Sequence, residues 1–237
     1  ATSTITVASV TVNSAGLLVV SRDAMNDSAV YNLNGGTMRT GSGYQTLGPV
    51  YLNGGTIVTG PGSGGPYQAY ALSGNVTVTG TAASVIAAGA GSNNGIHLVF
   101  NQLADGSMRN FLVQDATGDA GADLTVGAPL VDSSHTSKRA GLIKTGDGTL
   151  LLSAGTNTYS GATIVSNGTL LVSGGGVTGS VVTVVSGATF GAAGTNVARV
   201  AGLTLNEGAK LTWLYNGDKR AAGSIAVLGT LNLPAVA

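Results

Sequence analysis

The sequence lacks cysteine, contains a single glutamate, Glu207, and has few charged residues. The absence of cysteine excludes disulfide bonds and thiolate metal sites, and it is compatible with any cellular compartment. Charged residues make up 8% of the chain, against roughly 25% in an ordinary globular domain. The ten basic and ten acidic residues form no run of one sign, so nothing indicates a nucleic-acid partner or binding to an anionic membrane.

Long apolar runs and helical patterns are absent as well. No apolar run reaches the roughly 18 residues needed to cross a bilayer, so we expect no membrane span in this chain. Residues 1–12 lack the basic region and hydrophobic segment of a signal peptide, which suggests a removed signal or an excised segment. What the chain does contain is 39 glycines and many Ser and Thr residues, a composition that favours strands joined by tight turns.

Apolar residues recur at a nearly constant step. The first apolar residue after each glycine-containing turn returns every 19 to 21 residues on both sides of one gap. A second apolar residue usually follows two positions later, which is the alternation of a strand with one buried face. These first positions are Leu18, Met38, Ile57, Val76, Ile96, Leu150, Leu170, Phe190, Leu211 and Leu231.

A repeat of this length predicts a stack of coils. We expect an all-β fold, a right-handed parallel β-helix (β-solenoid) of about 20 residues per coil, because parallel crossovers are overwhelmingly right-handed. About ten to twelve coils would give a rod about 50 Å long. We treat residues 1–237 as a single β-solenoid domain.

A column of Asn and Ser residues supports the stack. These residues end one strand of each coil and are followed within three positions by glycine, a pattern suited to sharp corners with left-handed backbone. Antiparallel hairpins are the alternative, but hairpins do not require a constant step. The predicted turn ladder consists of Asn13, Asn34, Asn53, Ser73, Ser166, Ser186 and Asn206.

One segment resembles a known family. Residues 141–172 contain Lys-Thr-Gly-x-Gly-Thr-Leu, then Asn-Thr-Tyr-x-Gly, then a second Gly-Thr-Leu. This pattern resembles the autotransporter-associated β-strand repeat, and the resemblance implies a piece of a large secreted or surface-displayed bacterial passenger. The rest of the chain shares only the strand, Asn or Ser, Gly and strand unit. The motif residues are Lys144, Gly148, Thr149, Leu150, Asn157, Thr158, Tyr159, Gly161, Gly168, Thr169 and Leu170.

The repeat is interrupted between Ile96 and Leu150. We expect an irregular insertion around residues 101–141, where much of the charge is concentrated. Asp115, Asp119 and Asp123 follow one another at steps of four and suggest a calcium loop. They lack the alternating oxygen ligands and the bidentate Glu of a calcium-binding loop, so a solvated outward loop is the other interpretation.

A carbohydrate lyase or glycosidase is the main enzymatic alternative, because parallel β-helices often host such enzymes. Their chemistry needs paired carboxylates about 5 to 10 Å apart or a metal-assisted base. In the regular coils Asp147, Asp218 and Glu207 are isolated, and His97 and His135 are single histidines. We therefore predict a protein that is not an enzyme and needs no cofactor.

Partners are predicted from apolar residues at outward positions. Val19, Val58, Val99, Leu151 and Leu171 fall where the alternation points to solvent, so they form a candidate lateral interface. Both termini continue the strand pattern without a polar cap, which suggests end-to-end assembly or donation of the first strand to a neighbour. The predicted function is a non-enzymatic secreted or cell-surface structural protein: a scaffold, an adhesin passenger or a self-assembling extracellular fibre subunit. Its partners would be further copies of itself, or a host or matrix surface that includes glycans.

Overall fold

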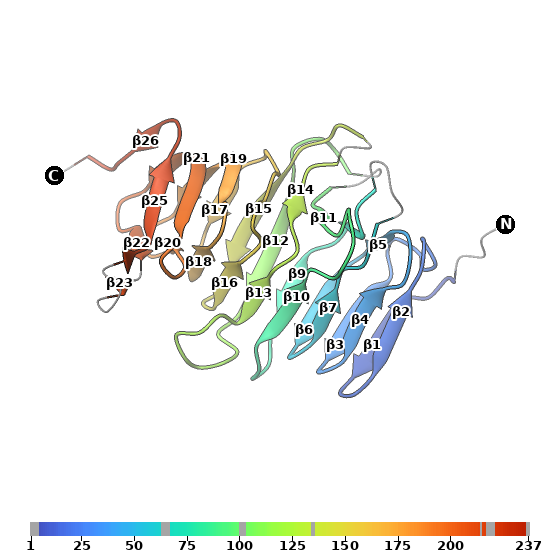
Figure 1. Ribbon diagram of the computed structural model, residues 1–237. Helices are drawn as coiled ribbons and strands as arrows, with labels where there is room; N and C mark the ends of the chain where they lie inside the picture. Colours follow the sequence, from blue (N-terminus) through green and yellow to red (C-terminus); the bar gives the residue numbers. More distant parts are fainter. Residues whose placement is uncertain are drawn as a thin grey trace.

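The computed structural model describes residues 5–62, 67–99, 103–133, 136–213, 215–216 and 221–235. All regular structure in these residues is β, and the named strands of the three larger sheets pair in parallel. Figure 1 shows the strands stacked side by side from the N-terminal to the C-terminal end of the molecule. The predicted right-handed parallel β-helix is confirmed.

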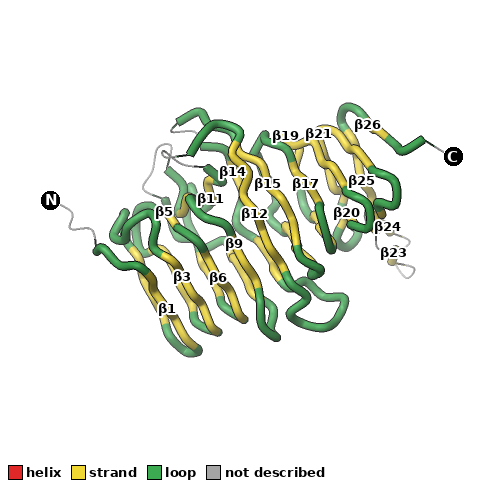
Figure 2. The backbone as a smooth tube through the Cα atoms, turned by 180° about the vertical axis from the view of Figure 1, so that it is seen from behind, coloured by secondary structure: helices red, strands yellow, loops and turns green. Residues whose placement is uncertain are grey.

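The first sheet contains eleven strands and runs along the whole stack. Figure 2 shows most of its strands in their stacking order. The order is β1 (Ser9–Asn13), β3 (Val30–Asn34), β6 (Val50–Asn53), β9 (Val76–Val78), β12 (Ser107–Val113), β15 (Ala140–Thr145), β17 (Thr163–Val165), β19 (Val177–Val184), β21 (Val197–Leu205) and β25 (Ser224–Val227), with β26 (Leu231–Asn232) also paired to β21.

Two further sheets complete the coils. The second sheet has nine strands: β2 (Leu17–Val20), β4 (Thr37–Thr40), β7 (Thr56–Val58), β10 (Ser84–Ala87), β13 (Leu124–Val126), β16 (Thr149–Leu152), β18 (Thr169–Val172), β20 (Thr189–Ala192) and β22 (Lys210–Trp213). The third sheet has four: β5 (Gln45–Leu47), β8 (Tyr70–Leu72), β11 (Ile96–His97) and β14 (Leu130–Val131). A separate antiparallel pair joins β23 (Tyr215–Asn216) and β24 (Ala221–Ala222).

The core is a set of apolar columns that run parallel to the stack axis. Leu150, Leu170 and Phe190 are partners in register on neighbouring strands, and each is fully buried. Burial of a side chain of this size contributes roughly 1.5–3 kcal/mol. The residue between two inward positions, such as Leu151, is only partly buried, so the period of two in the sequence is the inside–outside alternation of the coil.

The constant step of about 20 residues fails in the middle of the chain. Val76 pairs with Val50 in the first sheet, and Ile96 pairs with Tyr70 in the third sheet. The expectation that Val76 and Ile96 share one column with Leu18 is therefore wrong. The third sheet adds a third side to these coils, and the step from Val50 to Val76, in the coil that contains β8, is 26 residues.

Residues 101–141, expected as an irregular insertion, hold regular strands of the stack. β12, β13 and β14 lie in this segment, and β12 pairs in register with β9 on one side and β15 on the other. The additional residues are placed in the loops between these strands. Among the described residues, no helix is long and apolar enough to cross a membrane.

Candidate functional site

Lys144 of the repeat motif lies inside the coil. β15 directs its side chain inward, where it is fully buried. The Nζ atom donates hydrogen bonds to the backbone carbonyls of Thr145 (3.0 Å), Gly146 (2.7 Å) and Asn167 (3.0 Å). Because Asn167 belongs to the following coil, the ammonium joins two successive turns.

Burial opposes the positive charge of Lys144. Burial lowers the pKa of Lys144 to about 8, although the nearby carboxylates of Asp123 and Asp147 act in the opposite direction. The protonated form still predominates at neutral pH, and three carbonyl oxygens compensate for the lost water. The residue therefore acts as a fixed internal cation that crosslinks the turns.

Asp123 closes the loop between β12 and β13. Its side chain is buried, and Oδ1 accepts hydrogen bonds from the backbone N–H groups of Ala116 (2.8 Å) and Thr117 (2.9 Å). Oδ2 accepts one from the backbone N–H of Thr149 in the next coil (2.8 Å). Burial raises the pKa of Asp123, but these backbone donors outweigh it and leave the pKa below its ordinary value. The carboxylate is therefore a structural acceptor for two coils.

The three aspartates of the expected calcium loop are used by the loop itself. Asp115 accepts a hydrogen bond from the backbone of Gly118 (2.8 Å), and Asp119 accepts one from the backbone of Gly121 (2.6 Å). No group of three or more His, Cys, Asp or Glu side chains suited to a metal ion occurs in the described part of the chain, which includes Asp115, Asp119 and Asp123. These three carboxylates accept hydrogen bonds within or beside the loop and do not form a calcium site.

Asn157 and Tyr159 of the motif also point inward, and both are fully buried. Asn157 accepts a hydrogen bond from the backbone of Leu130 (3.0 Å) and donates one to the carbonyl of Gly176 (3.3 Å), so it connects the coils on either side.

The hydroxyl of Tyr159 starts a buried chain of hydroxyl groups. It lies 2.7 Å from Oγ1 of Thr163, which lies 2.7 Å from Oγ of Ser180. The sequence placed Thr163 in the repeat pattern but gave no internal contact for it or for Ser180, because a hydroxyl side chain in a strand is usually assigned to the outer face. Ser180 does occupy an inward position of β19, and this position was the available signal.

The remaining motif residues shape the turns and the core. A Cβ atom on Gly148 would lie 2.6 Å from Oδ2 of Asp123, and Gly168 has a φ of +64° in the left-handed region. Gly161 lies directly against the backbone of Ala140, and Thr158 is exposed. Two stacked pairs complete the motif: Thr149 with Thr169 and Leu150 with Leu170.

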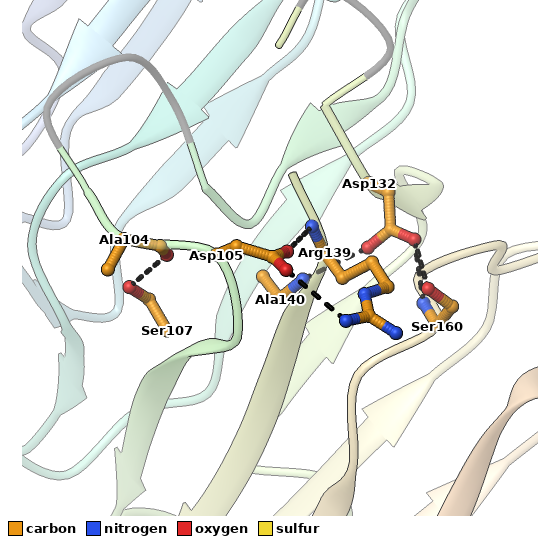
Figure 3. A network of polar contacts seen from close by, with 7 residues as sticks. All are labelled: Ala104, Asp105, Ser107, Asp132, Arg139, Ala140 and Ser160. Carbon is orange, nitrogen blue, oxygen red and sulfur yellow. Dashed lines mark hydrogen bonds and ion pairs between the residues drawn. The ribbon is translucent and has the colours of Figure 1, made fainter. Parts of the chain in front are cut away.

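An exposed polar network joins loops of neighbouring coils, as Figure 3 shows. Asp105 accepts hydrogen bonds from the backbone N–H (2.7 Å) and the guanidinium (3.2 Å) of Arg139, and these bonds lower the pKa of Asp105. Asp132 accepts backbone hydrogen bonds from Ala140 (3.1 Å) and Ser160 (3.0 Å). The carboxylates thus fix the loops beside the first and third sheets.

The predicted turn ladder is regular at its N-terminal end. Asn13 and Asn34 are partners in register, and Nδ2 of Asn34 donates to Oδ1 of Asn13 (3.3 Å). The carbonyl of Asn53 accepts a hydrogen bond from Gly35 in the same corner. Ser73 does not continue this column: it follows β8 in the third sheet, where its backbone N–H bonds to Leu47. Its assignment to the ladder is wrong because the third side was not foreseen.

The C-terminal part of the ladder contains a one-residue offset. The backbone N–H of Ser166 bonds to Lys144, and that of Asn206 bonds to Val184. In the coil between these two, the equivalent position is taken by Val185, whose backbone N–H donates to the carbonyl of Val165. Ser186, which was predicted for this position, follows one residue later.

The expected lateral interface is divided between two places on the second sheet. Leu151 and Leu171 are partly exposed neighbours in register, whereas Val19 and Val58 are separated by Arg39.

Val99 must be removed from the predicted interface, because its side chain is 0% exposed. It follows β11 on the third side, where His97 and Leu98 are also buried, so both faces of this segment are covered.

Of the two histidines, only His97 belongs to the described residues. His97 is buried; its Nε2 accepts a hydrogen bond from the backbone of Gln68 (3.3 Å), and Nδ1 lies 2.9 Å from the carbonyl of Asp132. His135 lies outside the described residues.

Comparison with protein families places these contacts in a known repeat. The model of the passenger-associated-transport-repeat matches residues 142–172, and this match confirms the resemblance to an autotransporter passenger repeat. No curated protein and no solved structure gives a significant match. Lys144, Asn157 and Tyr159 all lie within the matched segment, so the repeat contains several of the buried polar contacts described above.

Proposed function

We propose that this chain is a rigid, non-enzymatic stalk in a secreted or surface-displayed bacterial passenger. The observation that carries this proposal is the uninterrupted parallel ladder of the first sheet from β1 to β25. Every coil is hydrogen-bonded to the next along one axis, so a pull or a bend is shared among many backbone bonds. Such a rod is suited to hold another part of a protein at a distance from the cell surface.

The use of the polar motif residues supports a structural role. Lys144, Asn157 and Tyr159 are buried and make hydrogen bonds that link coils or fix a turn. A catalytic base or acid must reach a substrate, and none of these three side chains is accessible to one. The buried polar residues of the repeat therefore stabilise the rod from the inside.

The alternative function is a carbohydrate-active β-helix enzyme. The exposed cluster of Asp105, Arg139 and Asp132 is the place to examine, because glycosidases use two carboxylates about 5 to 10 Å apart. Each carboxylate of this cluster already accepts a backbone hydrogen bond from a neighbouring loop (Figure 3), which favours a structural assignment.

The proposed partner surface is the outer face of the second sheet. Leu17 and Val19 are 58% and 46% exposed on β2, and Leu151 and Leu171 are partly exposed further along the same sheet. Lateral contact with a second copy or with another segment of a passenger would bury these apolar groups.

The stalk proposal is tested by shape and by activity together. Negative-stain electron microscopy and light scattering should show discrete rods about 50 Å long. Incubation with a panel of plant and bacterial polysaccharides should release no reducing ends or unsaturated products. Turnover by the wild-type chain that Asp132→Asn abolishes would establish the enzyme, and long filaments would establish a fibre subunit instead.

A further inference from the structure

Asn167, in the turn between β17 and β18, is followed by a glycine. In an Asn–Gly pair the backbone nitrogen of the glycine can attack the side-chain amide of the asparagine, because glycine has no side chain to shield that nitrogen. Asn34 and Gly35 form a second pair of this kind. The contacts of the glycine N–H group distinguish the two pairs.

The reacting groups at Asn167 are held together. The backbone N–H of Gly168 donates to Oδ1 of Asn167 (2.8 Å), so the nitrogen lies beside the carboxamide. Nδ2 of Asn167 donates to Oδ1 of Asp147 in the preceding coil (2.6 Å), which fixes the orientation of the amide. Asn167 and Asp147 are exposed, so water reaches both. Such positioning lowers the entropic part of a reaction barrier.

The ammonium of Lys144 acts on the same peptide group. Its Nζ atom donates to the carbonyl of Asn167 (3.0 Å), and this carbonyl is conjugated with the nitrogen of Gly168. When that nitrogen loses its proton, the negative charge is shared with the carbonyl oxygen, where a fixed cation stabilises it. Lys144 is fully buried, and charges are less screened in the interior than in water.

Asn34 provides the comparison within the same chain. It is exposed and occupies a corner of the stack, where it pairs in register with Asn13. The backbone N–H of Gly35 donates to the carbonyl of Asn53 in the next coil (2.9 Å). Attack by this nitrogen therefore requires a hydrogen bond between coils to break first.

We propose that Asn167 is a site of spontaneous covalent modification, at which the folded chain promotes conversion of asparagine to aspartate and isoaspartate. The nitrogen of Gly168 loses its proton to solvent and forms a bond to Cγ of Asn167. The amide nitrogen takes a proton from solvent and leaves as ammonia, which gives a five-membered cyclic imide. One water molecule then opens the imide: attack at Cγ gives aspartate, and attack at the backbone carbonyl gives isoaspartate. The reaction needs no cofactor and is independent of the stalk proposal.

The products weaken the corner in which they form. A carboxylate at position 167 lacks the Nδ2 donor and meets the carboxylate of Asp147 across a contact that is 2.6 Å long in the unmodified chain. Isoaspartate also adds a methylene to the main chain, where even a Cβ atom on Gly168 would lie 2.4 Å from the carbonyl oxygen of Gly146. The modification therefore loosens the connection between two coils of the repeat.

Tandem mass spectrometry of the folded chain aged at neutral pH tests the proposal. Digestion in water enriched in oxygen-18 marks any conversion that takes place during the digest. Asn167 should convert at least about tenfold faster than Asn34, which corresponds to about 1.4 kcal/mol in activation free energy. In guanidinium chloride the two should convert at similar rates, because both are then flexible Asn–Gly pairs. Similar rates in the folded chain, or no conversion at Asn167, would overturn the proposal.

Lys144→Met tests the role of the ammonium. Asn167 should convert at least about fivefold more slowly than in the wild-type chain, whereas simple destabilisation would accelerate conversion at both Asn167 and Asn34. Lys210→Met is the matched control and should leave both rates unchanged. An unchanged or faster rate at Asn167 in Lys144→Met would refute the role of the ammonium. If this variant does not fold by circular dichroism, the comparison of folded and unfolded wild-type chain still decides the proposal.

Asn167→Asp carries one of the two products and tests the consequence. Its melting temperature should lie below that of the wild-type chain, because the new carboxylate faces Asp147. An equal melting temperature would show that conversion to aspartate does not loosen the corner.

Discussion

Replacement of Lys144 tests whether the repeat is held together from the inside. In Lys144→Met, a side chain of similar length keeps the apolar contacts, while the carbonyls of Thr145, Gly146 and Asn167 lose their donor. Hydrogen bonds to a charged group contribute about 1.5–3 kcal/mol each. The loss of a buried charge acts in the opposite direction, since a pKa of about 8 against 10.5 corresponds to about 3 kcal/mol. We expect a net loss of about 2–4 kcal/mol at pH 7.

The pH dependence of this loss has a definite sign. The folded chain releases the proton of Lys144 near pH 8, whereas an unfolded lysine retains it to about pH 10.4. Between these values the unfolded state binds more protons, so the stability of the wild-type chain rises with pH relative to Lys144→Met. The extra stability is fully present above about pH 10.4 and is lost as the pH falls through 8. Buried tyrosines titrate in both proteins and cancel in the difference.

Guanidinium chloride unfolding followed by circular dichroism, at pH 7 and pH 9.5, measures both effects. Lys210→Met is the matched control, because Lys210 is exposed on β22 and its replacement should change stability by less than about 0.5 kcal/mol. Equal stability of Lys144→Met and wild type at pH 7 would refute the internal crosslink. A difference that does not widen at pH 9.5 would refute the assignment of a lowered pKa to Lys144.

Further substitutions test the other internal contacts by thermal unfolding. Asp123→Ala should lower the free energy of unfolding by about 2–4 kcal/mol, because it removes the acceptor of three backbone N–H groups. The control Asp119→Ala should lower it by less than about 0.5 kcal/mol. Equal losses in the two variants would contradict the role of Asp123. Tyr159→Phe should lower the free energy of unfolding by about 1–2 kcal/mol, because it breaks the chain of buried hydroxyl groups. Tyr51→Phe, on the exposed face, should leave stability unchanged. Unchanged stability of Tyr159→Phe would show that the hydroxyl chain adds no stability. Gly148→Ala should lower the free energy of unfolding by at least about 2 kcal/mol, because the new Cβ would lie 2.6 Å from Oδ2 of Asp123. Unchanged stability of this variant would mean that the turn can shift to make room for the methyl group.

Much of the architecture could be predicted from local patterns. The alternation of apolar and polar residues around Leu150 and Leu170 predicts which side chains face inward. The constant repeat length predicts that the coils stack. The third sheet could not be predicted in this way, because a strand such as β11 looks the same in any sheet of a coil. Val76 and Ile96 were therefore assigned to the wrong columns, although each was correctly predicted to lie in a strand with its side chain in the core.

The polar interior was harder to predict, because polarity alone indicates an exposed side chain. Asp123 was considered as a metal ligand or a solvated loop residue, and only the fold shows that it accepts backbone hydrogen bonds from two coils. Lys144 was identified by its motif, but its burial depends on three carbonyl groups that come together only after two turns have formed.

These buried polar contacts address a problem inherent in stacked coils. Apolar columns such as Leu150, Leu170 and Phe190 are nearly interchangeable, so hydrophobic burial alone discriminates poorly between the native stacking and one displaced by a coil. A polar residue with a single set of partners does discriminate. In a displaced stack Lys144 would lose Asn167, and Asn157 would lose Leu130 and Gly176, which leaves buried donors and acceptors unpaired. The repeat therefore contributes specificity of register as well as stability, as a buried polar residue does in a coiled coil.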